Sequence, residues 1–460
     1  MSRTQSPPVA ASRAQLRLER ILLAVGVAAL GFNLRGAITS LPPVYPELQA
    51  RLHLSAATVS VLAATPVICF GLVSGFAAAL ARWAGEERVL LGAAFVLTAG
   101  LVARGAAPGA LLFPGTIAAS GAIAVMNVLL SSLIKRRWPD RAGLLIGIYI
   151  TALSAGAIVG SLVSVPLWQA TGGSVALTLG WLAAPAAVAV LLWLPQTRSR
   201  LRPAPAPAPA RAKAAPPPQE ATAPENTVRE RTGPPRVAVH RYALAWHVTL
   251  FMGLQSLLYY AALSWLPTML RGRGDSAAAA GDLLALMGVG NLAVSLFVPM
   301  AAQRMRSQYV LVVPTVAALG IGLAGLLYAP LGGAVGWALI LGAGQNAALA
   351  LGIFFTAHRA PDPVTAASLS ALAQAVGYLL ASAGPLEVGL LHSATGSWTA
   401  PVMVLFAFTV AAMVFGILAA RPRTLPAATA VPLTSPGGTA SGGTASGGTA
   451  SSGHAPEGDA

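Results

Sequence analysis

Apolar stretches about twenty residues long recur along almost the whole chain, and they constrain its fold more than any other feature. A helix needs about 20 residues to cross a hydrocarbon core about 30 Å thick. Only 9% of the residues are charged, against about 25% in soluble domains. We therefore expect an all-α integral membrane protein. Its twelve expected transmembrane helices occupy residues 21–42, 57–81, 88–105, 109–134, 142–167, 174–194, 243–270, 277–301, 308–329, 332–356, 364–391 and 398–420.

The basic residues lie mostly between these stretches and predict how the protein is oriented. With the amino terminus inside, the expected outer loops contain only Arg51, Arg104, Arg271 and Arg273 of the 29 Lys and Arg residues, and Arg35 lies inside a span. Cytoplasmic loops of membrane proteins carry an excess of Lys and Arg. We therefore expect both termini in the cytoplasm of a multi-pass protein of the cell (inner) membrane.

The net charge of +15 does not indicate nucleic-acid binding, because the basic residues form short clusters rather than one continuous face. The expected partners are the lipid bilayer and a small-molecule substrate, with no nucleic acid, and we expect a monomer. The single cysteine, Cys69, allows no intramolecular disulfide.

Composition divides the chain into five segments. Residues 195–240 are rich in Pro and Ala with mixed charge and cannot bury enough apolar surface to fold, so they predict a disordered cytoplasmic linker. Residues 422–460 contain a repeated Gly-Gly-Thr-Ala-Ser and predict a disordered cytoplasmic tail. The other segments are a cytoplasmic amino-terminal tail at 1–20, a six-helix half at 21–194 and a second six-helix half at 241–421.

The two halves show a weak internal repeat, which is common in transporters with six plus six helices. A shift of 224 residues superimposes similar residues: Pro43 on Pro267, Arg82 on Arg306, Lys135 on Arg359, Pro139 on Pro363, and Thr171-Gly172 on Thr395-Gly396. The shift also predicts that Arg35 lies opposite Tyr259.

Arg35 lies inside the first apolar stretch, about 21 Å along a helix that begins at Ile21. An arginine at mid-membrane costs about 2.5–3.5 kcal/mol and usually faces a cavity, a partner or a substrate path. The alternative is a side chain that snorkels to the outer interface near Pro42. Thr39 shares the helical face of Arg35, whereas Asn33 lies on another face and is expected to pack.

Further polar residues occur within other apolar stretches. Gln and Tyr are four residues apart in the spans at 243–270 and 364–391, and so share one helical face in each. They could line a cavity or form hydrogen bonds between helices, and the same alternatives hold for the isolated amides. The candidate substrate-binding residues are Arg35, Thr39, Gln255, Tyr259, Tyr260, Gln374, Tyr378, Asn127, Gln345 and Asn346.

Several enzyme and pump signatures are missing from the sequence. No G-x-x-x-x-G-K-[ST] loop supports ATP-driven transport, and no H-E-x-x-H motif indicates a metal site. Intramembrane carboxylates are too few for a paired acid and base. We therefore expect neither an enzyme nor a bound cofactor or metal, and no catalytic residues.

Several motifs taken together resemble the CynX/NimT branch of the major facilitator superfamily, which is named for cyanate and 2-nitroimidazole transporters. The motifs are LRGAITS at 34–40, TPVICFG at 65–71, NVLL at 127–130 before KRR at 135–137, the 251–260 segment with WLP at 265–267, and QAVGY at 374–378. The resemblance implies two pseudo-symmetric six-helix halves, alternating access around a central site, and small polar or anionic substrates. One departure is Arg82, which occupies the position of the usual Asp between spans two and three, so the gating ion pair of that loop does not carry over unchanged.

We therefore expect a secondary active transporter for a cyanate-like anion, a carboxylate or a nitroheterocycle. Arg suits this task because its fixed fork of donors matches a planar anionic or nitro group and stays charged when desolvated. Two alternatives stay open: an exporter of a neutral or cationic toxic compound, and a transporter-like ligand sensor. A coupling proton, the direction of transport and the substrate are not fixed by the sequence.

Overall fold

The computed structural model describes residues 13–138, 141–198, 238–294, 297–305 and 307–427. Most of the expected linker, most of the carboxyl-terminal tail and residues 1–12 of the amino-terminal tail lie outside the described residues. Every described element is helical. The first half contains α1 (Arg13–Thr39), η1 (Pro42–Val44), α2 (Tyr45–Leu52), α3 (Ala56–Ala84), α4 (Glu86–Ala106), α5 (Pro108–Arg137), α6 (Ala142–Ala170), α7 (Val175–Gly180) and α8 (Ala183–Arg198).

The second half begins with the short turn η3 (Val239–Arg241). Its remaining elements are α9 (Ala243–Gly272), α10 (Ala277–Val294), α11 (Phe297–Arg304), α12 (Tyr309–Tyr328), η4 (Leu331–Gly333), α13 (Ala334–His358), α14 (Pro363–Thr395) and α15 (Thr399–Ala420). The predicted helical class is thus confirmed over the described part of the chain.

Eleven described helical segments are long and apolar enough to span a membrane, one fewer than the sequence predicts. The expected span at 277–301 is described in two pieces, α10 and α11, because residues 295 and 296 lie outside the described residues, and it was therefore counted only as a shorter apolar segment. A break separates α7 from α8. It falls at Trp181 and Leu182, just before Pro185, which has no N–H to bond the carbonyl four residues back.

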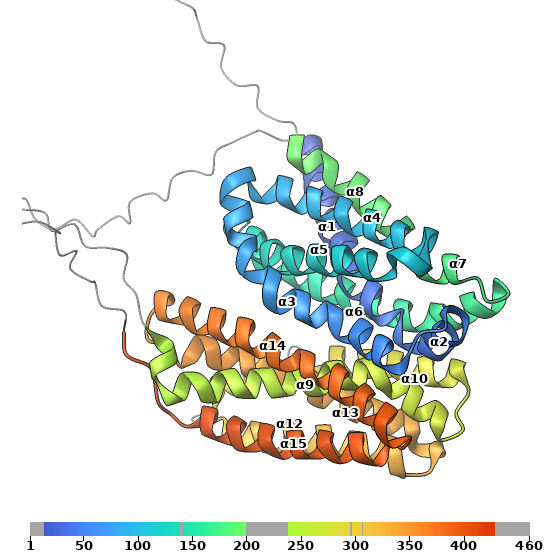
Figure 1. Cartoon of the computed structure of the whole chain (residues 1–460). Helices are drawn as coiled ribbons and strands as arrows, with labels where there is room; N and C mark the ends of the chain where they lie inside the picture. Colours follow the sequence, from blue (N-terminus) through green and yellow to red (C-terminus); the bar gives the residue numbers. More distant parts are fainter. Residues whose placement is uncertain (1–12, 139–140, 199–237, 295–296, 306, 428–460) are drawn as a thin grey trace, which may run out of the picture.

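The two halves lie side by side as separate helix bundles (Figure 1). The beginnings of α1 and α9 and the ends of α8 and α15 all lie at one end, which we call the terminal end. The opposite end, where α2 and the connection between α9 and α10 lie, is called the distal end. An even number of crossings in each half returns the chain to the end where it began.

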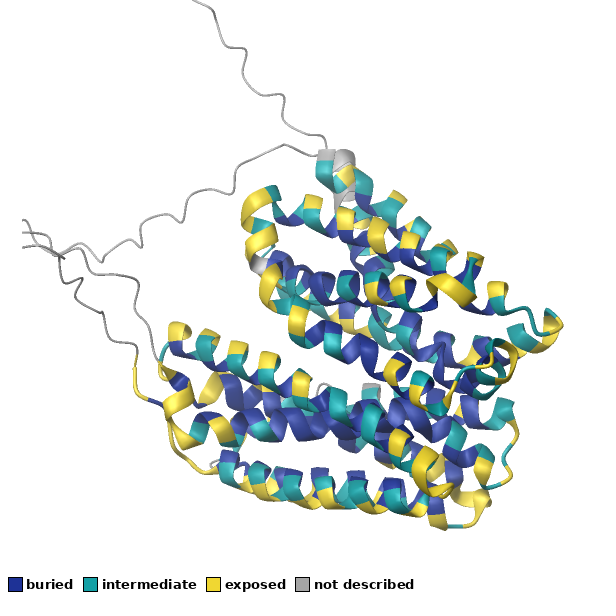
Figure 2. Cartoon of the chain, in the orientation of Figure 1, coloured by how far each residue is buried: buried dark blue, intermediate teal, exposed yellow. Residues whose placement is uncertain are grey.

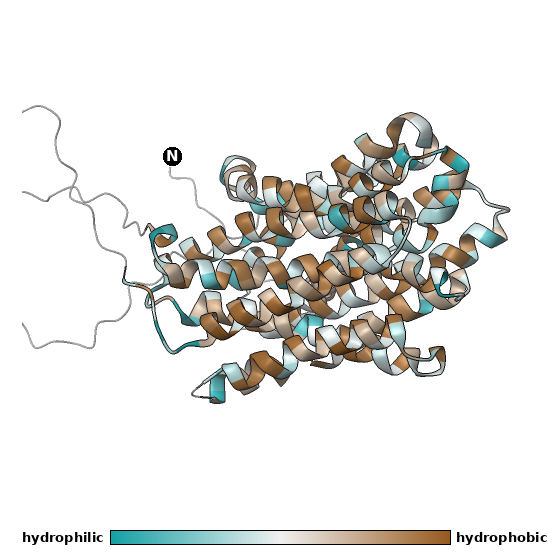
Figure 3. Cartoon of the chain, turned by 60° about the horizontal axis from the view of Figure 1, so that its bottom comes forward, coloured by the Kyte–Doolittle hydropathy of each residue, from teal (hydrophilic) through white to brown (hydrophobic). Residues whose placement is uncertain are grey.

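Burial separates the central helices from the peripheral ones (Figure 2). The most apolar window of α9 is 94% buried, although its mean hydropathy is only 1.2, the lowest among the eleven span candidates. In contrast, α15 has a mean hydropathy of 2.6 and is 33% buried. Apolar residues accordingly cover much of the outer helix surface (Figure 3). A helix that faces protein can carry polar side chains, whereas one that faces lipid cannot.

Glycines allow close contacts between the first and fifth long helices of the repeat. A Cβ placed on Gly156 would lie 1.9 Å from the carbonyl oxygen of Phe32, and one on Gly160 would lie 2.7 Å from that of Gly36. The two glycines have the G-x-x-x-G spacing that lets membrane helices approach closely. Gly384, which is 224 residues beyond Gly160, packs in the same way: its Cβ would lie 2.6 Å from the carbonyl oxygen of Leu257.

The two halves contact each other at the distal end through a cluster that we call the distal seal, formed by Tyr45, Glu47, Ser60, Trp265, Arg271 and Gly389. Arg271 Nη1 lies 2.8 Å from Glu47 Oε1. The Tyr45 and Trp265 rings are 6.1 Å apart. A Cβ on Gly389 would meet the Ser60 hydroxyl oxygen at 2.0 Å, so α3 and α14 are in direct contact there. Glu47 and Arg271 are again separated by 224 residues.

Arg104 requires a correction to the sequence-based topology. It was expected in an outer loop, but it lies in the last turn of α4 with a side chain that is 1% exposed. Its Nε donates to the carbonyl oxygen of Leu179 at 2.9 Å, so α4 is tied to α7. Arg104 lies in a helix rather than in a loop because α4 continues to Ala106 and α5 begins only two residues later.

The connection between α3 and α4, where Arg82 replaces the usual acidic residue, is tied to its own half. Arg136 forms an ion pair with Glu86 at 3.0 Å, and Arg137 pairs with Glu87. The Trp193 indole also donates to the carbonyl oxygen of Glu87 at 3.2 Å. These contacts join α4 to α5 and α8 and do not cross to the second half.

We expect Gly156→Ala to destabilise the protein, because its methyl group would overlap the α1 backbone and such overpacking costs about 1–3 kcal/mol. Gly147→Ala in the same helix is the matched control, since nothing lies within 4 Å of its added Cβ. Thermal unfolding of the two purified variants measures the difference. An equal transition temperature for both would contradict the close packing of α1 and α6.

Candidate functional site

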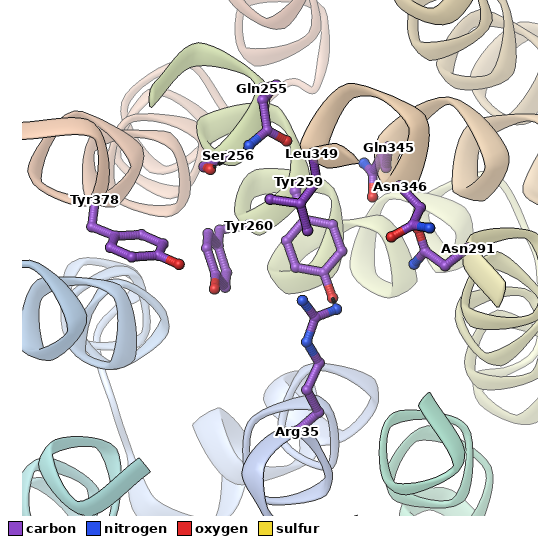
Figure 4. Close-up of a pocket in the computed structure, with 10 residues that line it drawn as sticks. All are labelled: Arg35, Gln255, Ser256, Tyr259, Tyr260, Asn291, Gln345, Asn346, Leu349 and Tyr378. Atoms are coloured by element: carbon purple, nitrogen blue, oxygen red, sulfur yellow. Dashed lines mark hydrogen bonds between the residues drawn. The ribbon is translucent and has the colours of Figure 1, made fainter. Parts of the chain in front are cut away.

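A small cavity lies between the two halves, near the middle of the long helices. Its volume is about 40 Å³. The lining residues come from α1, α9, α10, α13 and α14 (Figure 4): Arg35, Gln255, Ser256, Tyr259, Tyr260, Asn291, Gln345, Asn346, Leu349 and Tyr378. A cavity of this size suits a small solute.

Among the described residues of the first half, Arg35 alone lines the cavity, and its guanidinium points toward the α9 side (Figure 4). Nη1 donates to the Tyr259 hydroxyl at 2.5 Å, and the guanidinium carbon lies 4.8 Å from the centre of the same ring. The juxtaposition predicted by the 224-residue shift is thus confirmed. Glu47 and Arg271 of the distal seal are in contact at the same separation of 224 residues.

No acidic residue in the described part of the chain forms an ion pair with Arg35. The three ion pairs there involve Arg136, Arg137 and Arg271, and the cavity lining includes no carboxylate. Tyr259 is neutral and leaves the guanidinium charge uncompensated. A cation held away from water without a counter-ion is costly, so the cavity is electrostatically suited to an anion.

Aromatic rings form one wall of the cavity beside Arg35. The Tyr259 and Tyr260 rings meet edge to face at 5.0 Å. Phe70 of α3 lies behind them, 6.2 Å from Tyr260 and 5.8 Å from Tyr378, and so packs the rings of α9 and α14 against the first half. Edge-to-face contacts hold rings in defined orientations. This wall offers a flat face and three hydroxyl groups to a small solute.

Carboxamides and a hydroxyl line the rest of the cavity. Gln255 Nε2 donates to the Ser256 hydroxyl at 2.7 Å and to the carbonyl oxygen of Met252 at 3.1 Å. Asn291 of α10 and the neighbouring residues Gln345 and Asn346 of α13 lie on the other side of Tyr259 from Tyr378 (Figure 4). The cavity therefore combines one cation with neutral donors and acceptors.

The structure brings seven of the ten candidates together around this cavity, and three lie elsewhere. Thr39 is buried against α6, where its hydroxyl donates to the Ala157 carbonyl oxygen at 3.0 Å. Asn127 Oδ1 accepts from the Tyr149 hydroxyl at 2.6 Å. Gln374 Nε2 donates to the Ser370 hydroxyl at 2.9 Å. These three side chains are satisfied by neighbouring helices or by their own helix and do not line the cavity.

Three lining residues were not among the candidates: Ser256, Asn291 and Leu349. The sequence could have identified Asn291 as a candidate, because a single amide inside the apolar stretch 277–301 is unusual. Asn33, in contrast, was expected to pack. Its amide donates to the carbonyl oxygens of Ala29 and Pro185, at 2.8 and 3.2 Å, which confirms the packing role.

Comparison with known proteins supports this architecture. The family model of the Major Facilitator Superfamily matches residues 21–385. A bacterial homologue of the human lysosomal transporter Spinster, solved in an inward-facing and unoccupied conformation, aligns with a TM-score of 0.64. It shares 16% identity over 89% of this chain and 98% of its own. At this identity the likeness concerns the fold alone.

Sequence relatives are more informative about the branch. The uncharacterized transporter YycB of Bacillus subtilis is 34% identical over 88% of this chain and 95% of its own. The 2-nitroimidazole transporter of Escherichia coli is 34% identical over 88% of this chain and 97% of its own. The cyanate transport protein CynX of Escherichia coli is 27% identical over 80% and 89%, respectively. The chain therefore belongs to the Major Facilitator Superfamily, in the branch of the cyanate and 2-nitroimidazole transporters.

Proposed function

We propose that the protein is a secondary active transporter that moves a small anionic or strongly polar solute across the cell membrane by alternating access. The observation that carries the proposal is the guanidinium of Arg35, which faces a central cavity without a carboxylate partner in the described part of the chain. The relatives are named for cyanate, an anion, and for 2-nitroimidazole, which carries a planar dipolar nitro group. The nitro group presents two coplanar oxygens to a planar fork of donors, and cyanate supplies a negative charge to the guanidinium.

The cavity lies between two bundles that are each tightly packed, which supports alternating access by their relative movement. Close contacts at Gly156 and Gly384 lie within a half. The distal seal, in contrast, crosses between the halves through an ion pair and aromatic rings. Such a seal can open without disturbing the packing inside either half. With both termini in the cytoplasm, as the basic loops favour, the distal seal closes the outer side.

Substitution of Arg35 tests the anion role. We expect Arg35→Ala to reduce uptake in proteoliposomes at least about tenfold, because a buried charge partner is worth more than about 1.4 kcal/mol. Arg35→Lys should recover only part of this loss, since an ammonium lacks the planar fork. Transport by both variants at the parent rate, with either cyanate or 2-nitroimidazole as solute, would contradict the proposal.

The distal seal allows a test of alternating access. We expect Glu47→Cys/Arg271→Cys, in a Cys69→Ala background, to lose transport when a short bifunctional thiol reagent links the two cysteines. The link would hold the halves together at the distal end. Each single-cysteine variant is the control and should keep its transport after the same treatment. Unchanged transport by the linked double variant would contradict opening at this end.

Two exposed positions test the proposed orientation. Ala57 follows the distal connection between α2 and α3, and Trp83 lies at the terminal end of α3. We expect Ala57→Cys to react with a membrane-impermeant thiol reagent in intact cells, whereas Trp83→Cys should react only after permeabilisation. The opposite labelling pattern would place the termini outside. Both variants are made in the Cys69→Ala background.

A further inference from the structure

Three carboxamides at one side of the cavity have no hydrogen-bond partner in the described part of the chain. Gln345 is 3% exposed, and neither its Nε2 nor its Oε1 is hydrogen bonded. Asn291 and Asn346 line the same cavity. Elsewhere, the amide nitrogens of Asn33, Gln255 and Gln374 and the amide oxygen of Asn127 each have a partner, and Asn33 Oδ1 has none. Buried polar groups in proteins are generally hydrogen bonded, so the two free amide atoms of buried Gln345, beside the half-buried amides of Asn291 and Asn346, require an explanation.

Packing holds these amides in place. A Cβ on Gly290 would lie 2.4 Å from the carbonyl oxygen of Leu339, and one on Gly342 would lie 2.0 Å from that of Met287. These two contacts bring α10 and α13 together directly beside Asn291 and Gln345. The amides therefore lie on two helices in close backbone contact rather than on loops.

The opposite side of Gln345 offers no alternative partner. It borders a second, smaller void lined by Leu258, Ala262, Leu319, Leu323, Leu341, Leu405 and Thr409. The one hydroxyl there, that of Thr409, already donates to the carbonyl oxygen of Leu405 at 2.8 Å. This side is apolar apart from Thr409 and supplies no hydrogen-bond partner to the Gln345 amide, whereas the cavity on its other side can hold a polar solute.

We infer that Asn291, Gln345 and Asn346 form a second binding subsite, which recognises a neutral edge of the substrate that carries both a donor and an acceptor. The inference rests on the proposed function and deepens it. The anionic or nitro group would lie at Arg35, and the donor–acceptor edge would face the amides. A small heterocycle with a ring N–H fits both subsites, whereas a compact anion without a donor uses only the Arg35 subsite.

The proposed subsite predicts that the protein prefers heterocycles that carry a ring N–H. A site built to hydrogen-bond a substrate N–H or O–H rejects analogues that lack it, because its own polar groups are then left unpaired. The purified full-length protein should bind 2-nitroimidazole at least about tenfold more tightly than 1-methyl-2-nitroimidazole. It should discriminate similarly against 2-nitrofuran, in which an oxygen replaces the ring N–H and a C–H replaces the second ring nitrogen, without added bulk.

Variants test which residues produce the preference. Gln345→Met, Asn291→Leu and Asn346→Leu retain similar volumes but remove the amides. In at least one of them the ratio of the two dissociation constants should fall toward one, as measured by isothermal titration. Thr409→Val is the matched control, because it borders Gln345 from the second void without lining the cavity. It should keep the parent preference.

The outcomes separate this inference from the proposed function. The subsite is refuted if the parent binds the three heterocycles equally or not at all, or if the preference persists in all three amide variants. Cyanate reports on Arg35 alone: Arg35→Gln should weaken its binding and the amide variants should not. If Arg35→Gln binds cyanate as tightly as the parent and keeps the N–H preference, the anion role is refuted while the amide subsite stays supported.

Discussion

An uncompensated positive charge at the centre of a membrane-spanning bundle is the constraint on which the rest of the structure depends. Arg35 needs a solvated or polar environment, and the cavity between the halves supplies one. The surrounding tyrosines accept hydrogen bonds or present ring faces without neutralising the guanidinium. A carboxylate in the same place would stabilise the protein more but would compete with an anionic solute. The cavity thus keeps an electrostatic preference that a neutralised site would lack.

The two halves share the helix packing that forms the scaffold, whereas the residues that line the cavity differ between them. Gly160 and Gly384 are equivalent and both let a neighbouring helix approach closely. The cavity-lining residues of the two halves differ. Arg35 is the equivalent of Tyr259, so the first half contributes charge and the second contributes hydrogen-bonding groups. The second-half helix α9 can carry several polar residues because protein encloses it almost completely. Lipid contact would exclude such residues.

The strength of the contacts differs within and between the halves in a way that suits movement. Within a half, backbone atoms of neighbouring helices meet at glycines, and these contacts leave no room for rearrangement. Between the halves, the distal seal includes one close approach, of the Ser60 hydroxyl to Gly389, and otherwise consists of side chains, with a partly exposed ion pair between Glu47 and Arg271. Partly exposed ion pairs contribute little net stability, so they can separate and form again.

The sequence by itself determined the helical class, the family, and much of the site. Apolar length reports directly on membrane crossing, and the 224-residue shift predicted the contact of Arg35 with Tyr259. Helical periodicity cannot tell whether a polar stripe faces a cavity or a neighbouring helix, so Thr39, Asn127 and Gln374 were grouped with residues that the structure places apart from them. Only tertiary packing decided this, because hydrogen-bond partners such as Ala157 and Tyr149 come from other helices. The same reason explains Arg104, whose burial depends on a contact with α7.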